Sequence, residues 1–131
     1  MNIAHLFRIS ATIFAVIAVA FGMGTYTHAN FTNIHMLFGF IVALLLLIMS
    51  VITFFTAGLR ILGVMGIIYA LILPIFGVQQ VVILVGDLHW LVETVHLAVG
   101  FGAVALIGVM GERFTRSKKS VNKAATTSKA A

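Results

Sequence analysis

Two histidines stand in the same short motif, and the residues around them suggest what they could bind. The pattern H-x-x-x-G-F occurs at His35 with Gly39 and again, 61 residues later, at His96 with Gly100. Residues four apart share one face of a helix, so each glycine opens a hollow beside an imidazole. Neutral imidazole is a common ligand of iron, and a flat macrocycle needs such a hollow. The motif therefore predicts one heme between two helices, with His35 and His96 as its axial ligands.

The elements that must position these histidines are transmembrane helices. Hydrophobic residues make up 62% of the 131 residues and charged residues 8%, and the mean hydropathy is +1.19. A soluble domain has roughly a quarter of its residues charged, so a water-soluble fold is excluded. The chain has no cysteine, which excludes disulfides, thiolate metal sites and thiol nucleophiles.

Four apolar stretches approach the ~20 residues that a spanning helix needs. They cover residues 3–23, 33–57, 61–84 and 89–112. Short connections make neighbouring spans antiparallel, so the sequence predicts an all-α integral membrane protein with an up-down four-helix bundle over residues 1–113. The repeated motif lies on the second and fourth spans. It predicts a pseudo-twofold axis along the membrane normal that relates two helix pairs.

Basic residues indicate which side of the membrane each connection faces. Arg8, Arg60 and the six Lys and Arg residues from Arg113 onward fall on one side of the predicted bundle. Because cytoplasmic segments are enriched in Lys and Arg, both termini are expected in the cytoplasm, in a prokaryotic cell membrane. The tail, residues 114–131, is predicted to be disordered. It lacks an aromatic platform, so nucleic acid is not an expected partner. A cleaved signal peptide within residues 1–29 is the alternative.

The partner of His35 is left open by a count of helical rise, at ~1.5 Å per residue. His35 lies 25 residues above Arg60. His96 lies only 17 residues above Arg113, whereas His89 lies 24 above it. Depth thus favours His89 and the repeat favours His96, unless the fourth span is tilted or extends past Arg113. We predict His96 as the ligand and assign His89 to a propionate or to a second site.

Glu93 is the only acid inside a predicted span, four residues after His89 and three before His96. Ionisable groups inside a membrane are functional candidates, and this carboxylate could orient an imidazole or relay protons to a quinone. The alternative places Glu93 at the level of the lipid headgroups. A copper or zinc site at the outer face is a further option. Its ligands would come from His28, His35, Asp87, His89 and Glu93.

The residues around both histidines resemble one four-helix half of the heme A synthase family. The similarity rests on residues 34–39 (IHMLFG), on residues 77–80 (GVQQ), and on Trp90 shortly before residues 95–98 (VHLA). Such halves carry one heme-ligating histidine on the second helix and one on the fourth, near the outer face. More broadly, the chain is similar to four-helix b-type membrane cytochromes.

Two departures limit what this resemblance implies. Heme A synthases have a glutamate shortly before the second-helix histidine, whereas residues 30–34 (NFTNI) contain no carboxylate. The enzyme also uses two halves, and this chain has one. The resemblance therefore implies heme binding more strongly than heme A synthesis.

The predicted function is a membrane cytochrome with one heme b that transfers electrons. Its partners would be the quinone pool and a redox protein or respiratory complex at the outer face. One alternative is a heme-modifying or quinol-oxidising enzyme with Glu93 as its catalytic carboxylate. Another is a non-redox small subunit or assembly factor of a respiratory complex. The glycine-rich helices could also serve a homo-oligomer.

Overall fold

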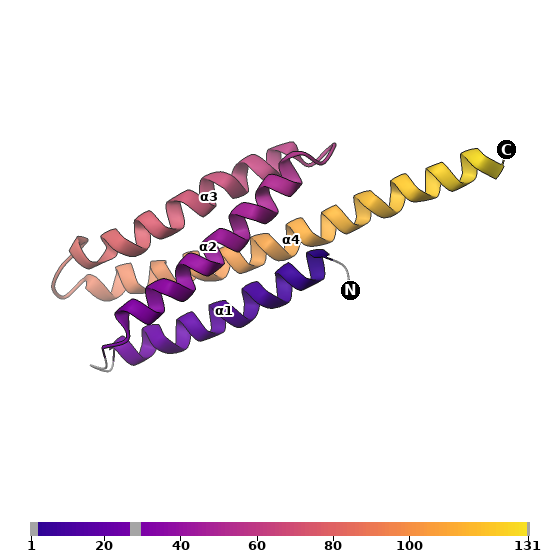
Figure 1. Ribbon diagram of the computed structural model, residues 1–131. Coiled ribbons are helices and arrows are strands. Elements are labelled where there is room, and N and C mark those ends of the chain that lie inside the picture. Colours follow the sequence, from indigo (N-terminus) through magenta and orange to yellow (C-terminus); the bar gives the residue numbers. More distant parts are fainter. Residues whose placement is uncertain (1–2, 27–29, 131) are drawn as a thin grey trace.

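Four long helices form the molecule (Figure 1). The computed structural model describes residues 3–26 and 30–130. The helices are α1 (Ile3–Tyr26), α2 (Thr32–Phe54), α3 (Arg60–Gln79) and α4 (His89–Ala130), with a 3-10 turn, η1 (Gln80–Val82), after α3. Every regular element in these two described ranges is helical. The predicted all-α class is confirmed.

Each long helix contains a segment long and apolar enough to cross a membrane. The segments are Ala4–Gly24, Thr32–Phe54, Arg60–Val82 and His89–Val121. Large apolar side chains are exposed on all four helices, as on a surface that meets lipid. Helices suit this setting because they satisfy their backbone hydrogen bonds internally. The composition and the structure thus agree on four apolar, helical candidate spans.

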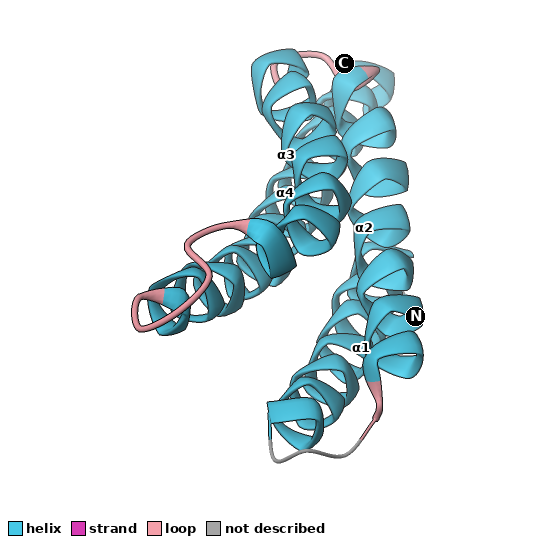
Figure 2. Cartoon of the chain, turned by 90° about the vertical axis from the view of Figure 1, so that its left-hand side faces the viewer, coloured by secondary structure: helices cyan, strands magenta, loops and turns pink. Residues whose placement is uncertain are grey.

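Helices α2 and α4 lie at the centre of the molecule. Both pack against α1 and α3 and against each other, whereas α1 and α3 make no contact within the described residues. The chain reverses direction between consecutive helices (Figure 1). Figure 2 shows the α1–α2 and α3–α4 pairs splayed apart toward the ends where each pair is connected. Residues near the starts of α2 and α4 therefore lie at this splayed end.

The buried residues of α2 and α4 follow one register. On α2 they are Val42, Leu46, Met49 and Thr53, and on α4 they are Ala103, Ile107, Met110 and Phe114. Each member of the second set lies 61 residues after its counterpart in the first, the same offset that separates the two histidines. Alternating steps of four and three residues keep one face of a helix in the core. The offset thus extends from the motif through the whole buried seam.

Small residues let the outer helices approach this seam closely. On α1 the buried residues Ala4, Ala11 and Ala18 recur every seven positions. On α3, a Cβ added to Gly63 would lie 2.5 Å from the backbone N and Cα of Phe54. Close backbone approach through alanine and glycine is how membrane helices commonly pack, because apolar side chains gain little by leaving lipid.

The helix ends differ in detail from the expected spans. Helix α2 ends at Phe54 rather than at residue 57, and α3 gives way to η1 after Gln79. The connection after α2 contains Gly58 with φ +79°, and the connection after η1 contains Gly86 with φ +107°. Both are left-handed conformations that glycine adopts without a steric penalty. These turns therefore end the spans earlier than hydropathy alone suggests.

The segment expected to form a disordered tail, residues 114–131, is helical as far as Ala130. A helix that is already nucleated by its membrane span extends one residue at a time without a new nucleation cost. Arg116 forms an ion pair with Glu112 one turn earlier, and the Lys118 ammonium lies 4.8 Å from the centroid of the Phe114 ring. Both contacts favour continuation of the helix, which composition alone does not register.

Candidate functional site

The imidazole rings of His35 and His96 lie together between α2 and α4. Their centroids are 5.8 Å apart and the ring planes make an angle of 56°. Two imidazoles that bind one metal ion from opposite sides have metal–nitrogen distances of about 2 Å each, which puts the centroids roughly 6 Å apart. Both side chains are half-buried. The spacing therefore suits two ligands of a single ion, and the repeat brought these two histidines together as expected.

The orientation of His35 is fixed by α1. Its Nδ1 lies 2.7 Å from the carbonyl oxygen of Ala18. A carbonyl only accepts, so Nδ1 carries the proton and donates it, and Nε2 keeps the free lone pair. Metal-binding histidines are commonly held in this way by a backbone carbonyl, which also raises the basicity of the ligating nitrogen. His35 is thus already in the tautomer that a metal ligand needs.

His96 has an unsatisfied polar atom. Its Nδ1 is buried and has no hydrogen-bond partner among the described residues. The ring of Phe76, from α3, lies beside it with centroids 5.9 Å apart. A buried polar atom without a partner costs free energy and calls for an explanation, such as a ligand at the site. The imidazole of His96 is therefore less completely accounted for by protein contacts than that of His35.

Four glycines surround the two rings. A Cβ added to Gly39 or to Gly100 would meet no atom within 4 Å, so both positions are open. A Cβ on Gly22 would lie 3.0 Å from Nδ1 and Cε1 of His35. A Cβ on Gly77 would lie 3.4 Å from Cε1 of His96. Two glycines thus leave space beside the rings, and two allow the rings to lie close against α1 and α3.

The roles of Gly22 and Gly77 are not apparent from the repeat. Each follows a phenylalanine, so the dipeptide Phe-Gly occurs near the end of α1 and of α3. Gly22 precedes His35 by 13 residues, but Gly77 precedes His96 by 19. The longer connection before α4 shifts the register, so self-comparison at a single offset misses the pair. A search for the dipeptide that allows a variable loop length would have found it.

The remaining candidates lie around the two rings or away from them. His89 is the first residue of α4, and its Nδ1 lies 3.2 Å from the carbonyl oxygen of Ile83. Glu93 is half-buried, one turn before His96, and makes no hydrogen bond to either histidine in the part of the chain described. His28 lies outside the described residues. Within them, no group of three His, Asp or Glu side chains could hold a metal ion.

The long α4 helix explains why the count of helical rise favoured His89. In the common register of the buried seam, Phe114 corresponds to Thr53, so Arg113 is level with the last turn of α2. Arg113 therefore does not lie at the level of Arg60, which begins α3. Counting upward from Arg113 assigns too shallow a base to α4 and makes His96 appear too low.

Comparisons with known proteins do not add to this description. No family model matches the chain, no curated protein is similar enough to count as a relative, and no solved structure matches the fold. The functional argument therefore depends on the geometry of the site.

Proposed function

We propose that this chain is a membrane cytochrome in which His35 and His96 are the axial ligands of one b-type heme. The observation that carries the proposal is the 5.8 Å separation of the two imidazole centroids. Three features of the same site support it. The Ala18 carbonyl sets the tautomer of His35, Nδ1 of His96 lacks a partner in the described chain, and space is open at Gly39 and Gly100.

The protein's own residues would hold the ligands at a fixed separation. The seams of α2 and α4 pack against each other below the histidines, and small core side chains leave little room for sliding. His89 and Glu93 lie two turns and one turn before His96 on α4, where we assign His89 to a propionate and Glu93 to orienting an imidazole. When bound, a heme with two histidine ligands supplies a one-electron couple without an open iron position.

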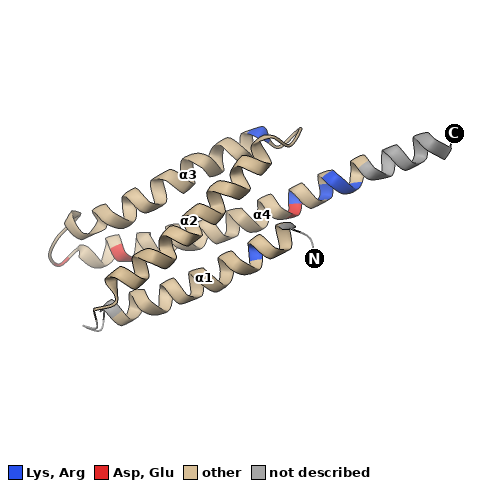
Figure 3. Cartoon of the chain, viewed as in Figure 1, with Lys and Arg blue, Asp and Glu red and all other residues tan. Residues whose placement is uncertain are grey.

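The proposed task is electron transfer between the quinone pool and a redox protein or respiratory complex at the outer face. We place the protein in a prokaryotic cell membrane as an up-down bundle with both termini in the cytoplasm. The basic segments of α1, α3 and α4 gather toward one end of the molecule, opposite the splayed end (Figure 3), which supports this orientation. The common register of the two buried seams supports a pseudo-twofold relation between the helix pairs.

The proposal is tested by the heme content of the purified protein. We expect about one heme per chain in the wild type after expression with ample heme, and a loss of most heme in His35→Ala and in His96→Ala. His89→Ala is the matched control, because its ring contacts the Ile83 carbonyl rather than His35. Equal heme content in all three variants would overturn the ligand assignment.

A Glu93→Gln variant separates the cytochrome from a catalyst. We expect this variant to keep its heme and most of its rate of reduction by quinol, because a carboxylate that only orients an imidazole is partly replaced by an amide. Complete loss of turnover with heme retained would instead identify Glu93 as a catalytic carboxylate, as in a heme-modifying or quinol-oxidising enzyme.

A further inference from the structure

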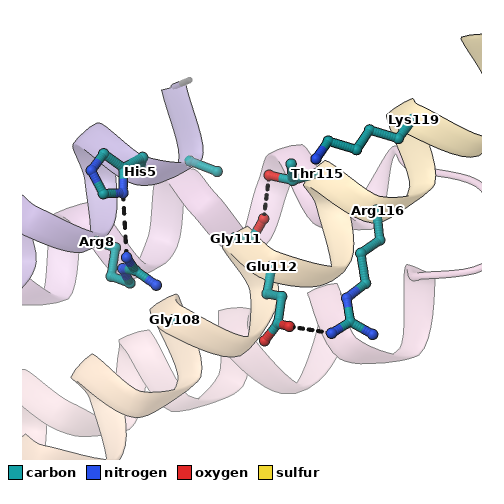
Figure 4. Close-up of a pocket in the computed structure, with 9 residues that line it drawn as sticks. His5, Arg8, Gly108, Gly111, Glu112, Thr115, Arg116 and Lys119 are labelled. Atoms are coloured by element: carbon teal, nitrogen blue, oxygen red, sulfur yellow. Dashed lines mark hydrogen bonds and ion pairs between the residues drawn. The ribbon is translucent and has the colours of Figure 1, made fainter. Parts of the chain in front are cut away.

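A groove lies at the opposite end of the molecule from the two histidines. It has a volume of about 340 Å³ and runs between the first turns of α1 and the middle of α4 (Figure 4). Its floor is made of small residues, Ala4, Gly108 and Gly111. A Cβ on Gly111 would lie 3.3 Å from Cβ and from the carbonyl oxygen of Ala4. The glycines thus bring α1 and α4 together and keep the floor low.

The walls of the groove carry an excess of positive charge from two helices. Arg8 comes from α1, and Arg116 and Lys119 come from α4. Glu112 is the only acid that lines the groove, and its carboxylate is paired with Arg116. Arg8 Nη2 lies 3.3 Å from Nδ1 of His5, a nitrogen that can accept a hydrogen bond but brings no negative charge. Arg8 and Lys119 therefore have no acidic partner among the described residues.

An apolar strip leads away from the groove along α1. Starting from His5, the helix exposes Ile9, Ile13 and Val16 at steps of four, four and three residues, with exposed fractions of 40%, 52% and 62%. Residues at these steps lie on one face of a helix. A cationic groove at the end of a membrane helix and an apolar strip below it match the two parts of a lipid, the headgroup and the acyl chain.

We propose that this groove binds the phosphate group of an anionic phospholipid, with its acyl chain along the α1 strip. The leaflet concerned follows from the proposed membrane topology, in which the basic end faces the cytoplasm. Arg8 and Lys119 supply the charge, and the floor at Gly108 and Gly111 admits the phosphate. Basic residues near a membrane surface attract anionic headgroups with about 1 kcal/mol each, which corresponds to roughly a fivefold change in affinity.

The test measures lipid binding to the purified full-length protein by native mass spectrometry. The probes are phosphatidylglycerol, phosphatidylcholine with the same acyl chains, and inorganic phosphate. We expect the wild type to prefer phosphatidylglycerol and the double variant Arg8→Gln/Lys119→Gln to lose that preference by about tenfold or more. The matched control is Arg60→Gln/Arg113→Gln, which removes two exposed positive charges at the same end but outside the groove.

Each outcome decides the proposal. An equal loss in both double variants would mean general charge attraction, and it would overturn a specific groove. Competition by inorganic phosphate as strong as that by the lipid would overturn the lipid as ligand. Circular dichroism checks that the variants fold, and a single Lys119→Gln variant replaces the pair if Arg8→Gln is unstable. The assay needs no heme, so its failure and the failure of the cytochrome proposal are separate results.

Discussion

Gly22 of α1 lies directly against the imidazole ring of His35. A Cβ at this position would be 3.0 Å from Nδ1 and from Cε1 of the ring, closer than nearly all real Cβ contacts. Gly77 of α3 stands in the same relation to His96, with 3.4 Å to Cε1. The first helix of each pair therefore supports the histidine of the second. The separation of the two rings depends on all four helices.

Substituting Gly22 by alanine should disturb the site without unfolding the protein. The added methyl group would push the His35 ring by a few tenths of an ångström and strain its 2.7 Å hydrogen bond to Ala18. We expect reduced heme content or a shifted absorption band in Gly22→Ala. Gly108→Ala is the control, because its Cβ would be at an ordinary 3.9 Å from Arg8 Cδ. An unchanged spectrum in both variants would remove the supporting role of α1.

Filling the open positions beside the rings should block the ligand and spare the fold. A Cβ on Gly39 or on Gly100 meets nothing within 4 Å, and replacing glycine in a helix interior stabilises it by about 0.5–1 kcal/mol. We expect Gly39→Leu and Gly100→Leu to melt no earlier than the wild type while binding less heme. The control Ala98→Leu adds the same side chain at an exposed position of α4. Full heme content in both glycine variants would show that these hollows face lipid.

Substituting Gly63 should destabilise the packing of α3 on α2. Its Cβ would lie 2.5 Å from the backbone of Phe54, which cannot move without shifting a helix. Overpacking of this kind costs about 1–3 kcal/mol. We expect a lower melting temperature for Gly63→Ala in detergent, measured by circular dichroism. Gly108→Ala again serves as the control, and equal melting of the two variants would contradict the close α2–α3 contact.

Removing the Tyr69 hydroxyl tests the contact between α3 and α4. The hydroxyl donates a 2.9 Å hydrogen bond to the carbonyl oxygen of Val99, one turn after His96. Hydrogen bonds between membrane helices average about 0.6 kcal/mol. We therefore expect Tyr69→Phe to lower the melting temperature slightly and to leave the heme spectrum unchanged. A large spectral change would mean that this bond also positions His96.

The sequence predicted the parts of this fold that depend on local pattern. Apolar runs of the right length predicted four helices, and the H-x-x-x-G-F motif predicted that His35 and His96 would meet. The 61-residue offset also relates residues that were not part of the motif, such as Met49 and Met110 in the buried seams. A repeat of this length carries information because both copies must place the same face toward a common core.

Other features depend on tertiary context that no local pattern contains. Connections of different length separate Gly22 from His35 and Gly77 from His96, so a single offset hides the equivalent glycines. The helical state of residues 114–130 depends on the span before it, which nucleates the helix. The level of Arg113 depends on where α4 ends, and a count of helical rise assumed an end that the structure does not have.

The most direct test of the central claim is a reduced-minus-oxidised visible spectrum of the detergent-purified protein and of His35→Ala and His96→Ala. The account predicts a sharp low-spin spectrum in the wild type that is lost in both variants and retained in His89→Ala. A featureless wild-type spectrum after expression with ample heme would contradict it. The paired histidines would then serve helix packing rather than electron transfer.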